Sequence, residues 1–259
     1  MSLEVVTTRA LLAERLDADR AGGVAVGFVP TMGYLHEGHG SLVEASVAAT
    51  DQTVVSVFVN PLQFGPGEDL EAYPRDLDAD LDLCEARGAA LVFHPTVDEV
   101  YPEGPVEPSV PVASLALRLE GERRPGHFAG VVEVVARLFR AVGPCRAFFG
   151  QKDFQQLQVV RRMVMDLGLP VEVVGCPTSR EPDGLARSSR NVYLTGAERA
   201  AAPVLHRALL AGVAAVAEPG WDRTAVEEMM VDMVAAEPAA SVEYAVVVDP
   251  STLLAAAEP

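Results

Sequence analysis

Two histidines separated by two residues stand in the stretch PTMGYLHEGH, which runs from Pro30 to His39. An apolar run ends at Pro30, a loop with a glycine follows, and the pattern predicts a helix that begins near Gly38. His36 and His39 then lie on one face of the first helical turn. The N–H groups and dipole of a helix N-terminus favour phosphate, and imidazoles can donate hydrogen bonds to it. The stretch therefore predicts a phosphate site; the alternative is a structural histidine pair.

A second polar stretch, GQKDFQQ from Gly150 to Gln156, again lies between a predicted strand and a predicted helix. Lys152 is the single lysine among 20 Lys and Arg residues, which indicates a position that needs a compact point charge. Lys152 can neutralise phosphate, and Asp153 can accept hydrogen bonds from ribose hydroxyls; the alternative is an exposed ion pair. Gln155 and Gln156 point about 100° apart on a helix, so one of them is expected to face the pocket.

A third polar stretch runs from Arg180 to Asn191 and contains two serines between two arginines. Hydroxyl and guanidinium groups on a loop with a glycine suit pyrophosphate, and such a loop can close over a leaving group. The alternative is a solvated linker. Three weaker stretches carry polar side chains after a strand or before a helix: Asn60 with Gln63, Tyr73 with Arg75, and Arg124 with His127.

The composition narrows the class of protein. The chain has 259 residues, 49% hydrophobic and 22% charged, as expected of a globular protein. A formal net charge of −17 argues against nucleic-acid and anionic-membrane binding, so positive charge for an anionic substrate must be gathered locally. We see no apolar run of ~18–20 residues and no signal-peptide pattern, and we expect a soluble cytoplasmic protein. Cys84, Cys145 and Cys176 form no CxxC pair, so neither a zinc site nor a disulfide framework is indicated.

Buried strands alternate with helical periodicity along the first 178 residues, which predicts a doubly wound parallel sheet, an α/β fold. The expected strands are 24–29, 54–59, 90–93, 147–149 and 171–174, and the expected helices are 41–49, 77–86, 131–141 and 154–167. After about Thr178 two alanine-rich helices, 197–217 and 224–236, precede one expected strand, 243–248. We therefore predict a domain at 1–178 and a smaller C-terminal α+β lobe at 179–259.

The HxGH element at His36 to His39 resembles the phosphate-binding motif of the nucleotidyltransferase superfamily, which implies a Rossmann-like domain and attack at the α-phosphate of a nucleotide. Taken together, the six stretches are similar in order and spacing, from about Val24 to Leu194, to the pantothenate synthetase (pantoate–β-alanine ligase) family. The resemblance implies that pantoate attacks ATP to give pantoyl adenylate and pyrophosphate, and that β-alanine then displaces AMP.

The resemblance also implies roles for individual residues. Catalytic roles fall on His39, His36, Lys152, Ser188, Ser189 and Arg190. ATP binding falls on Met32, Gly33, His36, Gly38, His39, Gly150, Lys152, Asp153, Ser179, Arg187, Ser188, Ser189 and Arg190. Binding of pantoate and β-alanine falls on Gln63, Gln156, Asn60, Tyr73, Arg124 and His127. Mg²⁺ is expected to arrive mostly on the ATP phosphates, with Asp80 as a contributor that the sequence does not assign.

Four residue types differ from those usual in the family, namely Ser179, Arg187, Glu133 and Gly40, and of these Arg187 bears most on nucleotide binding. The family resemblance also implies a homodimer. Two other functions stay open: a nucleotidyltransferase that moves AMP or CMP onto a phosphorylated substrate, and a non-catalytic ATP-binding homologue. The first does not account for Gln63, Gln156 and the Asn60 loop, and the second predicts loss of His39, Lys152 or Ser188.

Overall fold

The computed structural model describes residues 3–104, 108–111 and 114–257. The chain divides into two compact units, Met1–Thr178 and Ser179–Pro259. Each unit has a hydrophobic cluster of its own. The assignment of ATP and pantoate binding to the first unit, and of a phosphate loop to the second, stays a prediction.

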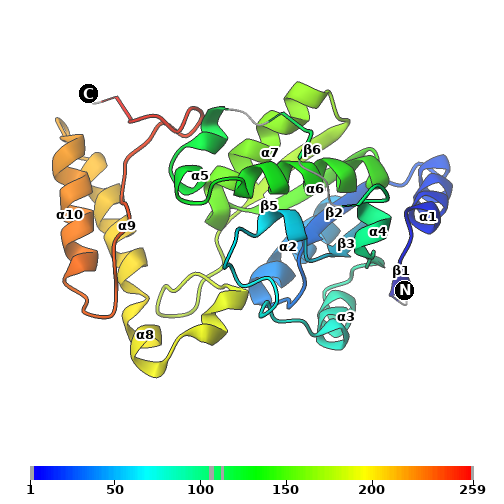
Figure 1. The fold of residues 1–259 in the computed structure, drawn as a ribbon, viewed down its shortest axis with the longest axis horizontal. Coiled ribbons are helices and arrows are strands. Elements are labelled where there is room, and N and C mark those ends of the chain that lie inside the picture. Colours follow the sequence, from blue (N-terminus) through cyan, green and yellow to red (C-terminus); the bar gives the residue numbers. More distant parts are fainter. Residues whose placement is uncertain (1–2, 105–107, 112–113, 258–259) are drawn as a thin grey trace. The chain divides into compact units, whose positions relative to one another are not determined.

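In the described part of the first unit, six parallel strands form one sheet (Figure 1). They are β1 (Glu4–Val6), β2 (Val26–Thr31), β3 (Gln52–Val57), β4 (Leu91–Phe93), β5 (Cys145–Gly150) and β6 (Val171–Cys176). The strand order is β1-β4-β3-β2-β5-β6, so β2, β3 and β4 follow one another outward in one direction, β5 and β6 do so in the other, and β1 lies at the edge beside β4. In such a sheet the carboxyl ends of the two central strands flank a crevice where ligands bind.

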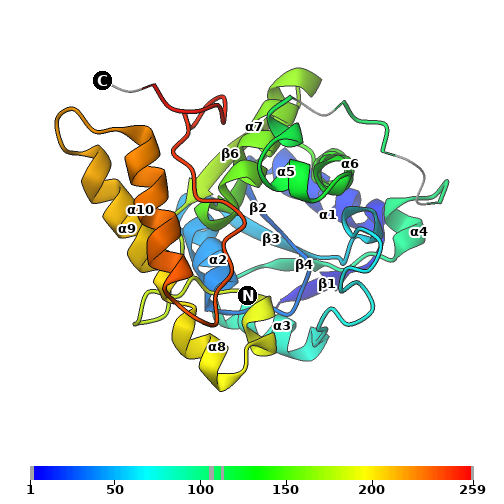
Figure 2. The same ribbon diagram turned by 60° about the vertical axis from the view of Figure 1, so that its left-hand side comes forward.

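Helices cover both faces of this sheet (Figure 2). The helices α1 (Arg9–Ala21), α6 (His127–Val142) and α7 (Phe154–Leu167) lie on one face, and α2 (Glu37–Ala49) and α3 (Leu77–Ala86) lie on the other. Short helices α4 (Val97–Val100) and α5 (Glu120–Arg123) and 3-10 turns at Pro61–Gln63, Ser114–Leu117 and Gln151–Asp153 occur in the connections.

Side chains along each inner strand point alternately to the two faces of the sheet and contribute to the hydrophobic packing on both. Phe28 packs edge-on against Phe139 of α6, with ring centroids 6.1 Å apart, whereas its neighbour Val29 belongs to the cluster that includes Leu42 and Val43 of α2. Successive strand side chains point to opposite faces, so a strand covered on both sides is apolar throughout. The doubly wound parallel sheet predicted from the sequence is thereby confirmed.

Two N-terminal elements were missed. Strand β1 has three residues, too few for a periodic signal, and pairs at the sheet edge with β4. Helix α1 buries Leu12 and Leu16 while charged residues fill most of its other positions, so its apolar stripe is narrow. Thr8 marks its start, because the Thr8 hydroxyl accepts from the Leu11 N–H at 3.2 Å.

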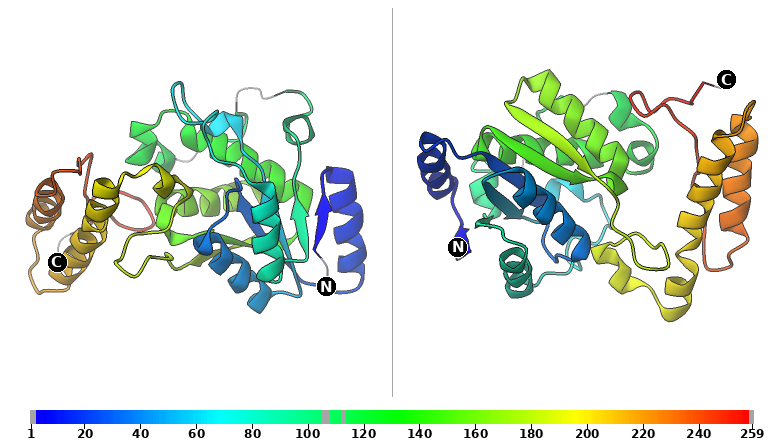
Figure 3. Two further views of the ribbon diagram at one scale, coloured as in Figure 1. Left: turned by 90° about the horizontal axis from the view of Figure 1, so that it is seen from below. Right: turned by 180° about the vertical axis from the view of Figure 1, so that it is seen from behind.

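The second unit, in its described residues, contains α8 (Gly196–Ala201), α9 (Val204–Val216) and α10 (Arg223–Ala235), with a 3-10 turn at Ser189–Tyr193. Helices α9 and α10 lie side by side (Figure 3), joined by a core that includes Ala208 and Met230. The helix expected at 197–217 is two helices. The break comes at Ala202–Pro203, where proline lacks an N–H and restricts the residue before it.

The prediction of a strand at 243–248 was wrong. In the described residues only Val248 pairs, through an isolated antiparallel bridge to Ala255. A strand needs a partner along its whole length, and here the Val247 N–H donates to the Glu227 carboxylate at 2.8 Å instead. The carboxylate of Asp249 accepts from the Ser251 and Thr252 N–H groups, and this tight turn limits the pairing to one bridge.

Among the described residues, the segment Gly196–Val216 is long and apolar enough to cross a membrane by length and composition, a run that we did not expect from the sequence. The segment is not one helix, since it is broken at Ala202–Pro203. Its second part, α9, packs on α10 through Val204 and Ala208. A helix that contributes to the core of a soluble protein meets the same criteria, so the finding is weak evidence for a membrane span.

Helix α6 also positions the loop after β3. A Cβ atom on Gly130 would lie 2.1 Å from the carbonyl oxygen of Leu62 and 2.7 Å from the amide nitrogen of Gln63. Real Cβ atoms do not approach backbone so closely, so the turn at Pro61–Gln63 rests directly on the helix backbone. The absence of a side chain at Gly130 therefore allows the turn that carries Gln63 to pack against α6.

We predict that Gly130→Ala lowers the free energy of unfolding by about 1–3 kcal/mol, because the added methyl group must push the Leu62 turn away. Chemical denaturation of the purified protein measures this. Gly196→Ala is the matched control, since a Cβ there meets nothing within 4 Å and the change is expected to be neutral or slightly stabilising. Equal stability of the Gly130 variant and the wild type would contradict the close contact.

Candidate active site

The two histidines of the PTMGYLHEGH stretch lie at the start of α2, directly after β2. His36 is the N-cap residue, and its Nδ1 accepts from the Gly38 N–H at 3.0 Å. The Nδ1 atom of His39 accepts from the His36 N–H at 3.3 Å, and the two ring centroids are 4.2 Å apart. Because both Nδ1 atoms accept, each ring carries its proton on Nε2, which makes Nε2 the donor.

The His39 ring is neutral at physiological pH. Burial first, and then the electrostatic effects of His36 and Lys152, lower the pKa of His39 to about 3. An imidazole that stays neutral can donate one hydrogen bond from Nε2 without bringing a charge of its own. Together with the N–H groups at the α2 N-terminus, these rings offer donors to an anion rather than a salt bridge.

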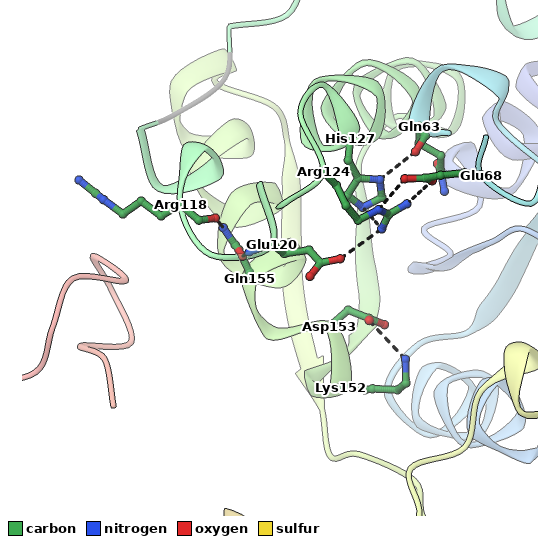
Figure 4. Close-up of polar contacts among 9 residues, drawn as sticks. All are labelled: Gln63, Glu68, Arg118, Glu120, Arg124, His127, Lys152, Asp153 and Gln155. Atoms are coloured by element: carbon green, nitrogen blue, oxygen red, sulfur yellow. Dashed lines mark hydrogen bonds and ion pairs between the residues drawn. The ribbon is translucent and has the colours of Figure 1, made fainter. Parts of the chain in front are cut away.

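The lysine stretch lies at the end of β5, the strand beside β2 in the sheet. Lys152 and Asp153 occupy the 3-10 turn before α7, and the Lys152 Nζ atom is 3.4 Å from the Asp153 carboxylate (Figure 4). Both side chains are exposed, so this pair holds neither residue firmly. Because β2 and β5 are neighbouring parallel strands, the two motifs that follow them lie at the same edge of the sheet, and Lys152 contributes to the lowered pKa of His39.

The loop after β3 presents Gln63 through a buried asparagine. Asn60 is 1% exposed, and its Oδ1 accepts from the Tyr101 hydroxyl at 2.7 Å and from the Leu62 N–H at 3.3 Å. Its Nδ2 donates to the Gly130 carbonyl at 3.1 Å and to Gln63 Oε1 at 3.3 Å. The Asn60 side chain is thus bonded within the protein, where it orients Gln63. The Nε2 atom of Gln63 lies 2.7 Å from the Met32 sulfur.

The same loop is held by an arginine directly after α5 and by the histidine at the first position of α6 (Figure 4). The Arg124 guanidinium donates to both Glu68 oxygens at 2.9 and 2.6 Å, and it lies 3.5 Å from Glu120. The His127 Nδ1 atom is 2.9 Å from the Gln63 carbonyl oxygen, and its Nε2 atom is 3.2 Å from Arg124. Arg124 holds the pKa of Glu68 below its usual value, so the pair is charged at neutral pH.

Tyr73 lies farther along this loop. Its side chain is 5% exposed, and its ring packs edge-on against Phe64 with centroids 5.9 Å apart. The Tyr73 carbonyl accepts from the Arg75 guanidinium at 2.8 Å. Tyr73 therefore fixes the loop as part of its small core, and direct contact with a substrate stays a prediction.

The two glutamines at the start of α7 have different surroundings. The Gln155 Nε2 atom donates to the Leu115 and Arg118 carbonyls at 2.8 Å each, and Oε1 accepts from the Glu120 N–H at 3.2 Å. Gln155 therefore holds the segment that leads into α5 (Figure 4), a role that its sequence position alone does not reveal. Gln156 is only partly buried, and its side chain makes none of these bonds, which favours it as the glutamine that faces a ligand.

The serine–arginine loop belongs to the second unit. The Ser188 hydroxyl accepts from the Arg190 N–H at 3.3 Å and caps the 3-10 turn, in which Ser189 is buried. Arg187 is 3.4 Å from the Glu181 carboxylate, and its N–H donates to the Ser179 carbonyl at 3.0 Å. The unusual Arg187 thus has a partner within its own loop, and phosphate binding by this loop stays a prediction.

Two other unusual residues also have structural partners. A Cβ on Gly40 would lie 3.4 Å from Nε of Arg87, which forms ion pairs with Glu37 and Glu44 of α2. Glycine therefore leaves room for a bridge between α2 and the end of α3. Glu133 is 2% exposed, and one of its oxygens accepts from the Ser109 and Val110 N–H groups at 2.8 and 3.1 Å.

No group of three or more His, Cys, Asp or Glu side chains that could hold a metal ion occurs among the described residues. Asp80, a residue considered for this role, has both carboxylate oxygens engaged by backbone N–H groups. A cavity of about 360 Å³ adjoins the histidine loop and is lined in part by Gly33, Asp80 and His94. Its wall is mainly apolar and includes Val57 and Phe58 at the end of β3.

The fold and this geometry define a doubly wound α/β protein whose histidine and lysine motifs follow β2 and β5, the two strands at the switch point of the sheet. Residues 4–258 match the model of the family described as pantoate-beta-alanine ligase. The chain is 51% identical over 251 residues to a pantothenate synthetase of Herpetosiphon aurantiacus, covering 97% of this chain and 89% of the relative. It is 56% identical over 229 residues to a pantothenate synthetase of Thermus thermophilus, covering 88% and 83%.

Solved structures agree with this relationship. A crystal structure of the pantothenate synthetase from Thermus thermophilus matches with a TM-score of 0.92 at 50% identity, covering 98% of this chain and 90% of that one. A pantoate-beta-alanine ligase from Francisella tularensis, complexed with beta-gamma ATP and beta-alanine, matches with a TM-score of 0.77 at 30% identity, covering 91% and 86%. This chain belongs to the pantoate–β-alanine ligase family.

We predict that Asn60→Ala lowers the free energy of unfolding by about 1–3 kcal/mol, because it leaves the hydroxyl of the fully buried Tyr101 without its acceptor. Chemical denaturation of the single variants and the double variant measures the coupling. Tyr101→Phe in the Asn60→Ala background removes the orphaned hydroxyl and is expected to restore part of the loss. Strict additivity of the two changes would show that the hydrogen bond contributes nothing.

Proposed function

We propose that this chain condenses pantoate with β-alanine in two ATP-dependent steps. A pantoate carboxylate oxygen attacks the α-phosphorus of Mg-ATP, the bond to pyrophosphate breaks, and pantoyl adenylate forms. The amine of β-alanine then attacks the acyl carbon, AMP leaves, and the amide of pantothenate is made. Adenylation turns a poor leaving group, oxide, into a good one, AMP. Family membership over nearly the whole chain supports this reaction.

The observation that carries the proposal is the meeting of His36, His39 and Lys152 at the ends of two neighbouring strands. In adenylate formation negative charge moves onto the departing pyrophosphate. The Nε2 donors of His36 and His39 stabilise that charge, and Lys152 neutralises phosphate. Because the rings are fixed by backbone N–H groups, they need no reorganisation when charge develops.

Other residues hold the substrates. Met32, Gly33, Gly38, Gly150 and Asp153 line the nucleotide, with Asp153 on the ribose. Gln63 and Gln156 bind pantoate, and Gln63 also lies near β-alanine. Asn60, Tyr73, Arg124 and His127 keep Gln63 and its loop in place, as their hydrogen bonds and packing support. In the second unit, Ser179, Arg187, Ser188, Ser189 and Arg190 form a phosphate-binding loop, for which the family resemblance is the support.

Magnesium enters as part of the Mg-ATP substrate, held mainly by the phosphates, because the described residues offer no ligand cluster for it. The chain acts as a homodimer in the cytoplasm. Three free and buried cysteines, Cys84, Cys145 and Cys176, fit a reducing compartment. The homodimer rests on the family resemblance alone.

The reaction is tested by pyrophosphate release from Mg-ATP and pantoate, first without and then with β-alanine. We expect about one pyrophosphate per site with pantoate alone, since the adenylate stays bound, and continuous turnover with AMP formation once β-alanine is present. Absence of release under both conditions would refute the proposed ligase. Release only with a phosphorylated acceptor would identify a nucleotidyltransferase instead.

Lys152→Ala is predicted to lower the rate of pyrophosphate release by about 100-fold or more, because the compact charge at the phosphate site is lost. The fold should be unaffected, because the Lys152 side chain is exposed and its one ion pair is weak. Arg162→Ala on α7 is the control, since it removes an exposed cation paired with Asp166 and should leave the rate unchanged. A near-wild-type rate for Lys152→Ala would remove this residue from the mechanism.

A further inference from the structure

Asp80 is a buried carboxylate outside the residues assigned to the reaction. It lies in the first turn of α3 and is 2% exposed. Its Oδ2 atom accepts from the Tyr34 N–H at 2.9 Å, and its Oδ1 atom accepts from the Leu35 N–H at 2.5 Å. Tyr34 and Leu35 are the two residues directly before His36. The carboxylate therefore binds the loop at the point where it enters the histidine pair.

The backbone of this loop is shaped around the carboxylate. Gly33 and Tyr34 both have positive φ angles, 82° and 50°, a conformation that a residue other than glycine rarely adopts. Successive residues of unusual conformation can turn neighbouring N–H groups toward one anion. A Cβ on Gly33 would lie 2.9 Å from Asp80 Oδ2 and 2.9 Å from a Val57 methyl group, so the loop is packed directly onto Asp80.

We propose that Asp80 is a positioning residue for adenylate formation, which holds the Tyr34–Leu35 backbone so that His36 and His39 present their Nε2 donors to phosphate. The path is short. Asp80 fixes the amides of Tyr34 and Leu35, the next residue caps α2, and its N–H donates to the His39 ring. The inference rests on the proposed function for the reaction step that it affects, but its effect on the rings does not depend on that function.

The charge of Asp80 belongs to this arrangement. Burial raises its pKa and Asp76 adds to that effect, whereas the two N–H groups and the nearby His94 oppose it. Each oxygen accepts one backbone hydrogen bond, and through these two bonds Asp80 acts on the loop backbone. An amide at this position offers one acceptor oxygen and places an NH₂ group against the other N–H. Asparagine therefore tests the charge and the second hydrogen bond at nearly constant volume.

The first measurement is pyrophosphate release from Mg-ATP with pantoate. We expect Asp80→Ala to lower the rate constant by about 100-fold through misplacement of the histidines. The KM for pantoate should stay within about twofold of the wild type, because Gln63 and Gln156 are untouched. Asp80→Asn should fall between Asp80→Ala and the wild type. Asp78→Asn is the matched control, an exposed aspartate in the same helical turn, and should behave as the wild type.

The second measurement is the titration of the His39 ring by NMR, which needs no substrate. In the wild type the ring stays neutral down to about pH 3. In Asp80→Ala and Asp80→Asn the released loop exposes the ring to water, and its pKa should rise toward the ordinary value near 6.5. Unchanged rates and an unchanged His39 titration in Asp80→Asn would overturn the inference. A wild-type protein that releases no pyrophosphate would defeat the proposed function, while the titration still decides the role of Asp80.

Discussion

The proposed phosphate site has to attract an anion to a strongly acidic chain, and this constraint decides which groups can form it. With a formal net charge of −17, the protein repels a nucleotide at long range, and attraction has to come from groups at contact distance. The groups that the structure offers at the proposed site are mainly uncharged donors. His39 is neutral because burial, and then the electrostatic effects of His36 and Lys152, lower its pKa to about 3, and both rings keep their protons on Nε2. Lys152 adds the point charge.

Neutral donors stabilise a developing charge well only when they are held in place. A mobile N–H group would be no better than water, because it would first have to reorient. The first unit holds the histidine loop, and other loops after its strands, with carboxylates and amides that bond groups distant in sequence. Asp80 holds two N–H groups before His36, Gln155 holds two carbonyls before α5, and Glu68 ties its loop to Arg124. Some of the acidic side chains that make the chain negative, such as Asp80 and Glu68, thus stabilise loops by accepting hydrogen bonds.

The fold could be predicted from the sequence wherever burial imposes a period. The apolar runs of the inner strands and the stripes of α6 and α7 are local signals, and so is the glycine-containing loop that ends at a capping histidine. The helix start near Gly38 follows from the same local chemistry, since His36 bonds the Gly38 N–H. The prediction failed for two segments. Strand β1 was missed because it has only three residues, and 243–248 was wrongly predicted as a strand because only one of its residues is paired.

The sequence indicated the residue types of the candidate site but not the contacts that support them. Asp80 is 46 residues from Tyr34 in the chain, and Asn60 is 70 residues from Gly130, so no spacing rule connects them. Their contacts exist because parallel strands bring loops from different crossovers to one edge of the sheet. A motif therefore reveals the groups that can touch a ligand, whereas the long-range hydrogen bonds that fix those groups follow only from the topology. Gly130 is the clearest example. Because it has no side chain, the turn that carries Gln63 can lie against α6, and nothing in the sequence around Gly130 reveals that contact.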